Sequence, residues 1–451
     1  MTAPARVAAY HALTAVGEGR LDLPAALTAS RDHLTDPRDK ALAADIVQGT
    51  LRWQRALDAV VELVARKGRV PTDHRVLTVL RLSLYQILHL DRVPASAVVD
   101  DAVDLARLAG RGQSAGFVNA CLRSVLRQRP RLALPARPAD VSSGDAALAY
   151  LGITHSHPNW LVARWLDRHG FEAAEAWVTF NNQPPPLTLR ANALCTDREA
   201  LQTWLAERGV VTHPTRYAPL GLIVDTVEDL RVLHDATDRF ALQDEASQSV
   251  ALLVGAQPGD RVLDLCAAPG GKTTAMAGDM QDRGVLVACD VRERRVRLLR
   301  SAVAASGAHA VRVLQVDRDG PLPFGPIFER VLVDAPCSGL GTLRRDPDIK
   351  WRRTESDLAR FAAAQRQLLQ RAADVVAPGG RLVYATCSSE PEENEAVVES
   401  FLAQHDEFRL DPSLEALPAQ TAALVDARGF LQTLPHRHGL EAFFGAALVR
   451  R

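Results

Sequence analysis

From about residue 258 onward, short apolar runs alternate with segments of helical periodicity, and this alternation constrains the fold more than any other feature of the chain. The runs are rich in Val and Leu and shorter than a buried helix, as expected for strands covered on both faces. Regular alternation of such strands with helices favours an α/β fold with a doubly wound parallel sheet. The strand candidates are RVLDL (261–265), VLVAC (285–289), VRVLQV (311–316), RVLVD (330–334), RLVYAT (381–386) and the final AFFGAALVR.

The front of the chain has a different pattern, which predicts an all-α region. Apolar residues recur at three- and four-residue steps in ALAADIVQGTLRWQRALDAVVELVARK and in RVLTVLRLSLYQILHL. Asp36-Pro37 and Val70-Pro71 mark helix starts, with proline at a tolerated early position.

Between these two regions the pattern changes twice. PRLALPARPADVSSGD has no periodicity and predicts a linker. Residues 151–180 are helical in pattern, and LTLRANAL, DREALQTWLAERG and GLIVD predict a small α/β unit near 184–240. We therefore expect a helical domain at 1–130, a linker at 131–150, a helical plus small α/β connector at 151–240 and the doubly wound domain at 241–451.

The composition excludes membrane and disulfide-stabilised classes. Charged residues make up 24% of the chain, and no run approaches the roughly 18 apolar residues of a membrane span. The start of the chain lacks the apolar core of a signal peptide, so we expect a cytoplasmic protein with no membrane partner. The six cysteines include no C-x-x-C pair, which predicts reduced thiols and no metal site.

The segment after the first strand, CAAPGGKTT, is rich in small residues that let the backbone approach a ligand closely. One alternative is a nucleotide-binding P-loop, because Gly271-Lys272-Thr273 matches the end of that motif. Cys266 stands where the P-loop needs its first glycine, and Pro269 removes an amide from the phosphate cradle. A nucleoside cofactor therefore fits this segment better than a triphosphate.

Two aspartates at strand ends support a nucleoside cofactor. Asp290 ends the second predicted strand, where a carboxylate can bind both ribose hydroxyls; a helix N-cap is the alternative. Asp317 follows the third strand and can face the adenine in the same way, or it can be a turn residue.

Two cysteines follow the fourth and fifth predicted strands. If these strands are neighbours in a parallel sheet, Cys337 and Cys387 emerge at the same edge, together with Asp334. A thiolate that adds to C6 of a cytosine, with N3 protonated, makes C5 able to attack a methyl sulfonium. Asp334 is the candidate proton donor at N3. One cysteine attacks C6 and the other assists proton removal or product release, and the spacing leaves these roles open.

These motifs resemble the RsmB (Fmu/Sun) family of bacterial ribosomal RNA cytosine-C5 methyltransferases. VLDLCAAPGGKTT, DAPCSGLGTLRRDPDIKW and LVYATCSSEPEENEAVV carry the resemblance, with LRANAL and QDEASQSVA before them. It implies a Rossmann-like domain dependent on S-adenosylmethionine (SAM), with Cys387 as the nucleophile and Cys337 assisting product release. It also implies SAM contacts at Cys266, Ala267, Ala268, Pro269, Gly270, Gly271, Lys272, Asp290, Asp317 and Asp334.

The first 130 residues resemble NusB, a helical RNA-binding fold, through VPASAVVDDAVDLARLAGRGQSAGFVNACLRSVL. This extension implies small-subunit (16S) ribosomal RNA as the substrate. The net charge is −1 for the whole chain, and the basic excess lies at the front, as expected for a part that meets a polyanion, although a solvated helix face gives the same excess.

Further candidate contacts to RNA follow the second cysteine motif. Arg344, Arg345, Lys350 and Arg352 are candidates for phosphate contacts. Trp351 is a candidate for stacking on a base, with a position at the edge of a core as the alternative. We expect a monomeric enzyme. The alternative from another class is an RNA-binding or ribosome-assembly factor with an idle methyltransferase domain.

Overall fold

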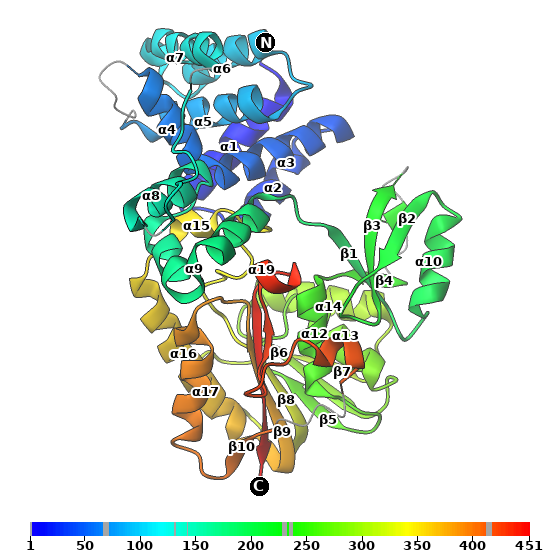
Figure 1. The fold of residues 1–451 in the computed structure, drawn as a ribbon. Helices are drawn as coiled ribbons and strands as arrows, with labels where there is room; N and C mark the ends of the chain where they lie inside the picture. The colour runs from blue at the N-terminus through cyan, green and yellow to red at the C-terminus, as the bar shows by residue number, and fades with distance from the viewer. Residues whose placement is uncertain are drawn as a thin grey trace. The chain divides into compact units, whose positions relative to one another are not determined.

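The described chain divides into two compact units, a helical unit and a sheet unit (Figure 1). The computed structural model describes residues 2–65, 72–129, 132–141, 143–227, 232–233, 238–411 and 417–451. The helical unit comprises Met1–Pro184 and Leu343–Arg353, and the sheet unit comprises Pro185–Thr342 and Thr354–Arg451. The chain therefore leaves the sheet unit after Thr342 and returns to it at Thr354. The four parts expected from the sequence stay a prediction.

The helical unit confirms the all-α pattern at the front of the chain. Its helices are α1 (Pro4–Gly17), α2 (Leu23–Asp32), α3 (Pro37–Arg52), α4 (Gln54–Val64), α5 (His74–His89), α6 (Ala95–Leu108), α7 (Ala115–Gln128), α8 (Gly144–Ala149), α9 (Asn159–Asn182) and the short α15 (Ile349–Arg352). Asp36 caps α3 as predicted, because its side chain accepts a hydrogen bond from the Arg38 amide. The helix start predicted at Val70-Pro71 includes residues outside the described ones.

Part of the predicted linker is helical. Residues 132–141 have no helix or strand, but α8 and a π-helical turn at Tyr150–Thr154 begin inside the range that was expected to be irregular. The sequence GDAALA is rich in alanine, which favours helix, and Ala147 and Leu151 are buried. The expectation of a linker through residue 150 was therefore wrong for its last part.

The segment 343–353 packs inside the helical unit. Lys350 is 1% exposed, and its ammonium donates to the carbonyl oxygens of Arg52 at 2.8 Å and Ser156 at 2.9 Å. Trp351 donates from Nε1 to the Leu51 carbonyl at 2.6 Å and packs against the helical core. The expectation that Lys350 contacts phosphates was wrong, since its amino group is buried and bonded inside the protein, and burial lowers its pKa well below the ordinary value. Trp351 takes the alternative position, at the edge of a core.

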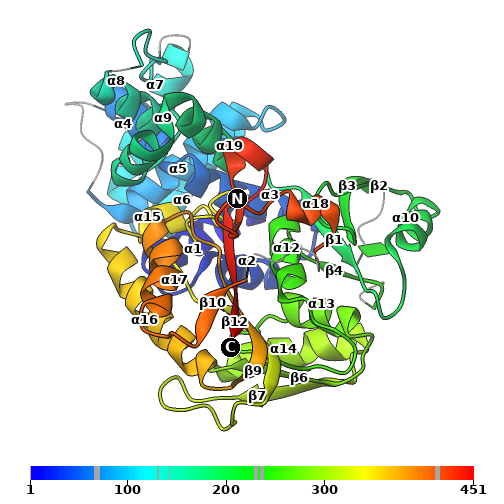
Figure 2. The same cartoon turned by 60° about the horizontal axis from the view of Figure 1, so that its bottom comes forward.

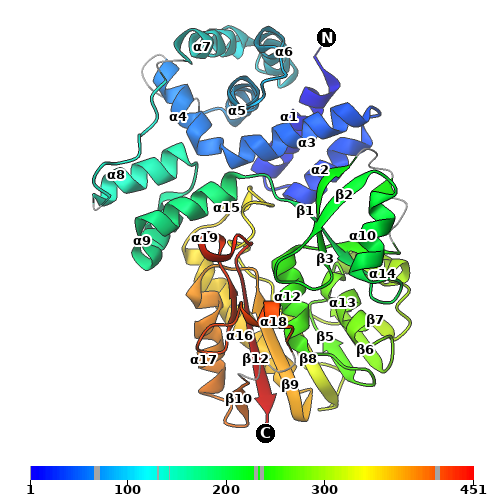
Figure 3. The ribbon, with the colours of Figure 1, turned by 45° about the vertical axis from the view of Figure 1, so that its right-hand side comes forward.

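The sheet unit begins with a small antiparallel sheet, which confirms the α/β unit predicted near 184–240. Its strands are β1 (Leu187–Ala191), β2 (Val210–Pro214), β3 (Gly221–Val227) and β4 (Phe240–Leu242), in the order β2-β3-β1-β4. Helix α10 (Arg198–Ala206) lies against one face of this sheet and contributes Leu201 and Leu205 to their shared core (Figure 3).

The large sheet contains every strand predicted from the apolar runs. Its strands are β5 (Arg261–Asp264), β6 (Val285–Asp290), β7 (Val311–Gln315), β8 (Phe328–Asp334), β9 (Val376–Thr386), β10 (Phe408–Leu410), β11 (Leu431–Thr433) and β12 (Phe443–Arg450). The order is β10-β12-β9-β8-β5-β6-β7, with β5 to β9 parallel. Strand β12 is antiparallel and lies between β9 and β10 (Figure 2).

Helices cover both faces of this sheet, which explains why its strands are apolar throughout (Figure 1). One face packs on α12 (Glu245–Val254), α13 (Gly271–Asp279) and α14 (Glu293–Ser306), and the other on α16 (Ser356–Ala373) and α17 (Glu395–Leu402). Successive residues alternate between the faces: Val262 points to the first core and Leu263 to the second. None of the described helices combines the length and apolarity needed to cross a bilayer.

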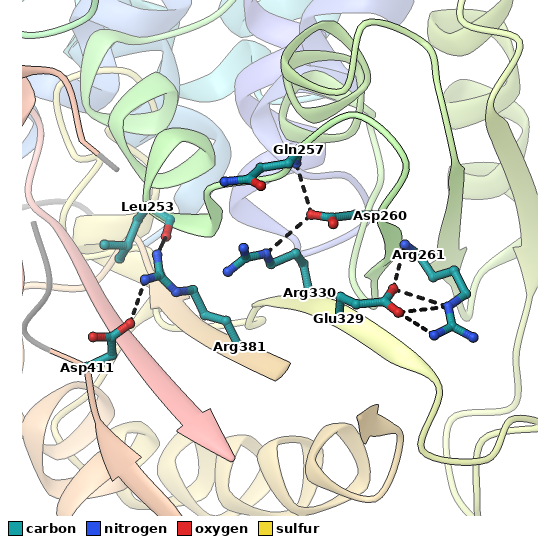
Figure 4. Close-up of polar contacts among 8 residues, drawn as sticks. All are labelled: Leu253, Gln257, Asp260, Arg261, Glu329, Arg330, Arg381 and Asp411. Atoms are coloured by element: carbon teal, nitrogen blue, oxygen red, sulfur yellow. Dashed lines mark hydrogen bonds and ion pairs between the residues drawn. The ribbon is translucent and has the colours of Figure 1, made fainter. Parts of the chain in front are cut away.

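Ion pairs occupy the amino ends of the central strands (Figure 4). Arg261 pairs with Glu329, Arg330 pairs with Asp260 at 3.3 Å, and Arg381 pairs with Asp411 at 2.5 Å. Because these charged side chains pair with one another, we look for the functional site at the opposite, carboxyl ends of the strands.

Candidate active site

The candidate site lies where the strand order of the large sheet reverses. The chain runs from the central β5 outward to β6 and β7, and then returns to β8 and β9 on the other side of β5. Ligands of open α/β sheets bind at the carboxyl ends of the strands beside such a reversal. The loops that follow β5, β8 and β9 are the ones that carry the sequence motifs.

The loop after β5 turns at a residue that must be glycine. Gly270 has φ +114°, and a Cβ there would lie 3.0 Å from Ala302 Cβ and 3.1 Å from Leu299 Cδ1. Arg190 of β1, 4% exposed, holds the start of α13, because its guanidinium donates to the Gly271 carbonyl and to Thr274 Oγ1 at 2.8 Å. The LRANAL segment thereby fixes the end of this loop.

Three strands end in aspartates that surround Cys266. Burial raises the pKa of its thiol above the ordinary range, and the negative charges of Asp334, Asp264 and Asp290 raise it further. Asp264 is 0% exposed, and burial, reinforced by the two other carboxylates, raises its pKa to about 7 even though Thr273 Oγ1 donates to it at 2.7 Å. Its Oδ1 has no hydrogen-bond partner among the described residues.

These features fit a cationic ligand that also donates hydrogen bonds, such as SAM, which carries an ammonium donor and a positively charged sulfonium. The three carboxyl groups attract such a ligand, and one of them, Asp264, also offers it a buried oxygen that lacks a donor within the described chain. The same charges repel a polyphosphate, and the Thr273 hydroxyl, which a P-loop would direct to a metal ion, donates to Asp264. The electrostatics therefore disfavour the P-loop alternative.

Asp290 and Asp317, the candidates for contacts with ribose and adenine, differ in their exposure to solvent. Asp290 is 5% exposed, accepts from the Arg292 amide at 3.1 Å and pairs with Arg295 Nε at 3.3 Å. Arg292 occupies the N-cap position of α14, so Asp290 does not cap that helix. Asp317 is exposed on the loop after β7, and its carbonyl accepts from Arg371 Nη2 at 3.1 Å.

The loops after β8 and β9 bring the two thiols together, as predicted. The strands are parallel neighbours with Asp334 opposite Ala385, and the sulfur atoms of Cys337 and Cys387 lie 3.1 Å apart. The pKa of Cys337 is raised well above its ordinary value, first by its hydrogen bond to Cys387, then by burial and by the negative charges of Cys387 and Glu393. Cys337 is therefore the thiol that stays protonated.

A lysine and aspartate pair lies beside the thiols. Lys272 Nζ donates to Asp334 Oδ2 at 2.8 Å and lies 5.5 Å from the ring centre of Phe443. Burial alone would lower the pKa of Lys272, but the charge and hydrogen bond of Asp334, with a smaller effect of Cys387, raise it above its ordinary value. Lys272 thus stays cationic close to Cys387. That it contacts a cofactor remains a prediction.

Three residues of this region were not singled out from the sequence. Asp264 lies inside the apolar run RVLDL, and Arg190 and Glu393 lie in segments that were noted only for their resemblance. An aspartate that ends an apolar strand, and an acidic run directly after the second cysteine motif, are the signals that point to Asp264 and Glu393.

Known proteins share the three parts of this chain. Residues 251–449 match the family described as 16S rRNA methyltransferase RsmB/F, residues 3–127 the NusB family, and residues 157–231 the ferredoxin-like domain of RsmF/B-like methyltransferases. The probable ribosomal RNA small subunit methyltransferase B of Bacillus subtilis is 35% identical over 428 residues, which cover 93% of this chain and 92% of its own.

Two solved structures have the same fold. The crystal structure of PH0851 has a TM-score of 0.80 and 26% identity, and the match covers 99% of both chains. That of a methyltransferase homologue from Pyrococcus horikoshii has a TM-score of 0.57 and 26% identity, covering 68% of this chain and 99% of its own. The chain therefore belongs to the RsmB/F family of 16S rRNA methyltransferases.

Proposed function

We propose that this chain transfers the methyl group of SAM to C5 of a cytosine in small-subunit ribosomal RNA, with Cys387 as the covalent nucleophile. The observation that carries the proposal is the pair of thiols, 3.1 Å apart, beside the Lys272–Asp334 ion pair. Relatives named ribosomal RNA small subunit methyltransferase B support the substrate class. In this proposal the protein acts in the cytoplasm as a monomer.

The cofactor residues follow from the loop after β5. Residues 266–272 hold SAM together with Asp290, Asp317 and Asp334, and the uncompensated acceptor of Asp264 supports a cation at this place. SAM supplies a methyl group on a positively charged sulfur. The carboxylates of the pocket stabilise that positive charge while the cofactor is bound.

The base is activated by addition of a thiolate. C5 of cytosine is a weak nucleophile, and addition of the Cys387 sulfur to C6, with a proton held at N3, converts the ring to an enamine. Lys272 stays cationic close to Cys387, where a positive charge suits a sulfur that attacks as a nucleophile. Asp334, bonded to Lys272, holds the proton at N3.

The second thiol completes the cycle. After methylation, C5 must lose its proton, and the carbon–sulfur bond to Cys387 must break to restore the aromatic ring. Cys337 is hydrogen-bonded to Cys387 and remains protonated, so it is placed to assist this release. The charges around the sulfurs thus support Cys387 as nucleophile and Cys337 as the assisting group.

Two cysteine variants test the proposal. Cys387→Ala should abolish transfer of labelled methyl from SAM to small-subunit RNA taken from cells that lack the protein. Cys337→Ala should accumulate a protein–RNA adduct that survives denaturation, because release is impaired. Cys195→Ala, an exposed cysteine of the sheet unit, is the matched control and should be active. Normal turnover of Cys387→Ala would contradict the nucleophile, and a freely dissociating product from Cys337→Ala would contradict the release role.

We propose in addition that the NusB-like domain at 1–130 binds RNA. Arg123 and Arg127 of α7 and the following Arg129 provide cations for the phosphate backbone, and Arg131 of the same run lies outside the described residues. Replacing the three described arginines by glutamine should weaken RNA binding, measured by filter binding, and leave SAM binding unchanged. If the variant binds RNA as tightly as the wild type, the proposed RNA-binding role of these arginines is contradicted.

A further inference from the structure

A buried carboxylate connects the two cysteine loops. Glu393, at the end of a short 3₁₀ helix (Pro391–Glu393), is 0% exposed. Its Oε1 accepts from the Ser338 amide at 2.8 Å, and its Oε2 accepts from the hydroxyls of Ser338 and Ser388, both at 2.5 Å. Ser338 follows Cys337 directly and Ser388 follows Cys387, so one side chain binds the neighbour of each thiol.

The same carboxylate is braced by the helix behind it. Gln365 of α16 donates from Nε2 to Glu393 Oε1 at 3.0 Å and to the Pro336 carbonyl at 3.1 Å. Four donors therefore converge on Glu393, and they offset the cost of burying a negative charge. Because these donors come from both cysteine loops and from α16, the carboxylate joins three parts of the chain at one point.

Glu393 is itself fixed to the strand that leads to Cys387. The hydroxyl of Tyr384 donates to the Glu393 carbonyl at 2.6 Å. The next residue, Asn394, accepts from Thr386 Oγ1 at 2.5 Å and donates to the Ser388 carbonyl at 3.0 Å. Because its backbone is tied to β9, the Glu393 side chain positions the Cys337 loop relative to that strand.

We propose that Glu393 is a positioning residue that sets the separation of the Cys337 and Cys387 sulfurs by binding the serine after each of them. This inference rests on the proposed function for its catalytic consequence. Addition of Cys387 to the base needs one correctly placed sulfur, whereas release needs both. Loss of Glu393 should therefore impair release more than addition, which a general loss of stability would not do.

The catalytic test uses the full chain and Glu393→Gln, which keeps the size of the side chain and removes its charge. We expect kcat to fall at least tenfold, the KM for SAM to change less than twofold, and the fraction of protein in a denaturation-resistant RNA adduct to rise. Glu399→Gln, an exposed glutamate of α17, is the control and should behave as the wild type. Equal loss of adduct formation and turnover would overturn the positioning role.

A second measurement reads the separation of the sulfurs without RNA or SAM. Hydrogen peroxide oxidises two thiols to a disulfide and yields two waters, and the link joins tryptic peptides 331–344 and 382–409, which mass spectrometry quantifies. We expect the disulfide to form at least tenfold more slowly in Glu393→Gln. Since Glu393 raises the pKa of Cys337, removal of its charge alone would speed the oxidation, so a slower rate reports geometry.

The two measurements separate the inference from the proposed function. Disulfide formation at the wild-type rate in Glu393→Gln would overturn the inference, whatever the methylation assay gives. A Cys337→Ala protein that forms no RNA adduct would contradict the proposed function and leave the sulfur separation testable. If Glu393→Gln does not fold, the double variant Ser338→Ala/Ser388→Ala removes the two hydroxyl bonds to the same carboxylate and should also slow disulfide formation; a wild-type rate in this variant would contradict the positioning role.

Discussion

At the scale of single residues, the two cysteines of the site, Cys337 and Cys387, have neighbours of opposite charge. Lys272 contributes a positive charge near Cys387, and Glu393 contributes a negative charge near Cys337. Sulfur atoms 3.1 Å apart would otherwise share one environment. Their different neighbours are what the proposed division of roles between nucleophile and assisting thiol requires.

Asp264→Asn should stabilise the free protein at high pH and weaken SAM binding. Burial raises the pKa of Asp264 from 3.8 to about 7, so its contribution to stability is fully present below about pH 4 and is lost as the pH rises through 7. The full shift corresponds to at most about 4 kcal/mol. Urea unfolding should show a larger advantage of the variant at pH 8 than at pH 5, and calorimetry a SAM affinity at least tenfold lower. An equal advantage at both pH values would contradict the assigned ionisation.

At the scale of elements, the amino and carboxyl ends of the strands in the large sheet carry different charged residues. Arginines of β5, β8 and β9 are bonded to carboxylates on one side of the sheet (Figure 4). Aspartates end β5, β6 and β8, and their negative charges act on Cys266. The loop after β8 is held in place by backbone bonds as well. Gly341 donates to the Cys387 carbonyl at 2.9 Å and accepts from the Ala442 amide at 3.0 Å.

Gly341→Ala should disrupt this loop. A Cβ at this position would lie 1.9 Å from the Ala442 carbonyl oxygen and 2.8 Å from that of Cys387, so the loop must move. We expect a loss of roughly 1–3 kcal/mol in unfolding free energy, typical of overpacking, and a fall in methyl transfer of at least tenfold. Gly325→Ala is the control, because nothing lies within 4 Å of its added Cβ. Wild-type activity of Gly341→Ala would show that the loop tolerates the shift.

The elements also show what the sequence could and could not predict. Strands β5, β6, β8 and β9 were predictable because strands with helices on both faces are largely apolar, and the neighbouring ends of β8 and β9 brought the cysteines together. Asp264 was hidden because its run continues to Leu265. Glu393 acquires its role only from the convergence of two loops, and Lys350 is buried only because two distant carbonyl groups meet it. Such roles depend on contacts that no local pattern encodes.

At the scale of the whole molecule, the helical unit is more than a front extension. The NusB family match covers residues 3–127, but the unit also includes α9 and the segment 343–353, which directly follows the loop of Cys337. Deleting residues 1–130 would remove the Arg52 carbonyl that binds Lys350 and the Leu51 carbonyl that binds Trp351. Point variants therefore test the role of this unit without removing the contacts that hold it together, as truncation would.

Lys350→Met should destabilise the helical unit. The variant leaves the buried carbonyl groups of Arg52 and Ser156 without their donor, and each unsatisfied group costs about 1–3 kcal/mol. We expect a loss of roughly 2–4 kcal/mol in urea unfolding. Arg107→Met, whose parent side chain is 64% exposed, is the control and should change stability little. A wild-type unfolding midpoint for Lys350→Met would contradict the assigned contacts.

The place of β12 in the large sheet has a consequence for how the protein is made. This strand, near the end of the chain, lies between β9 and β10 and pairs Phe444 with Thr386, next to Cys387. A chain that is still emerging from the ribosome therefore carries β9 with one side uncovered until β12 has been synthesised. The sheet beside Cys387 is complete only when this late strand has paired with β9.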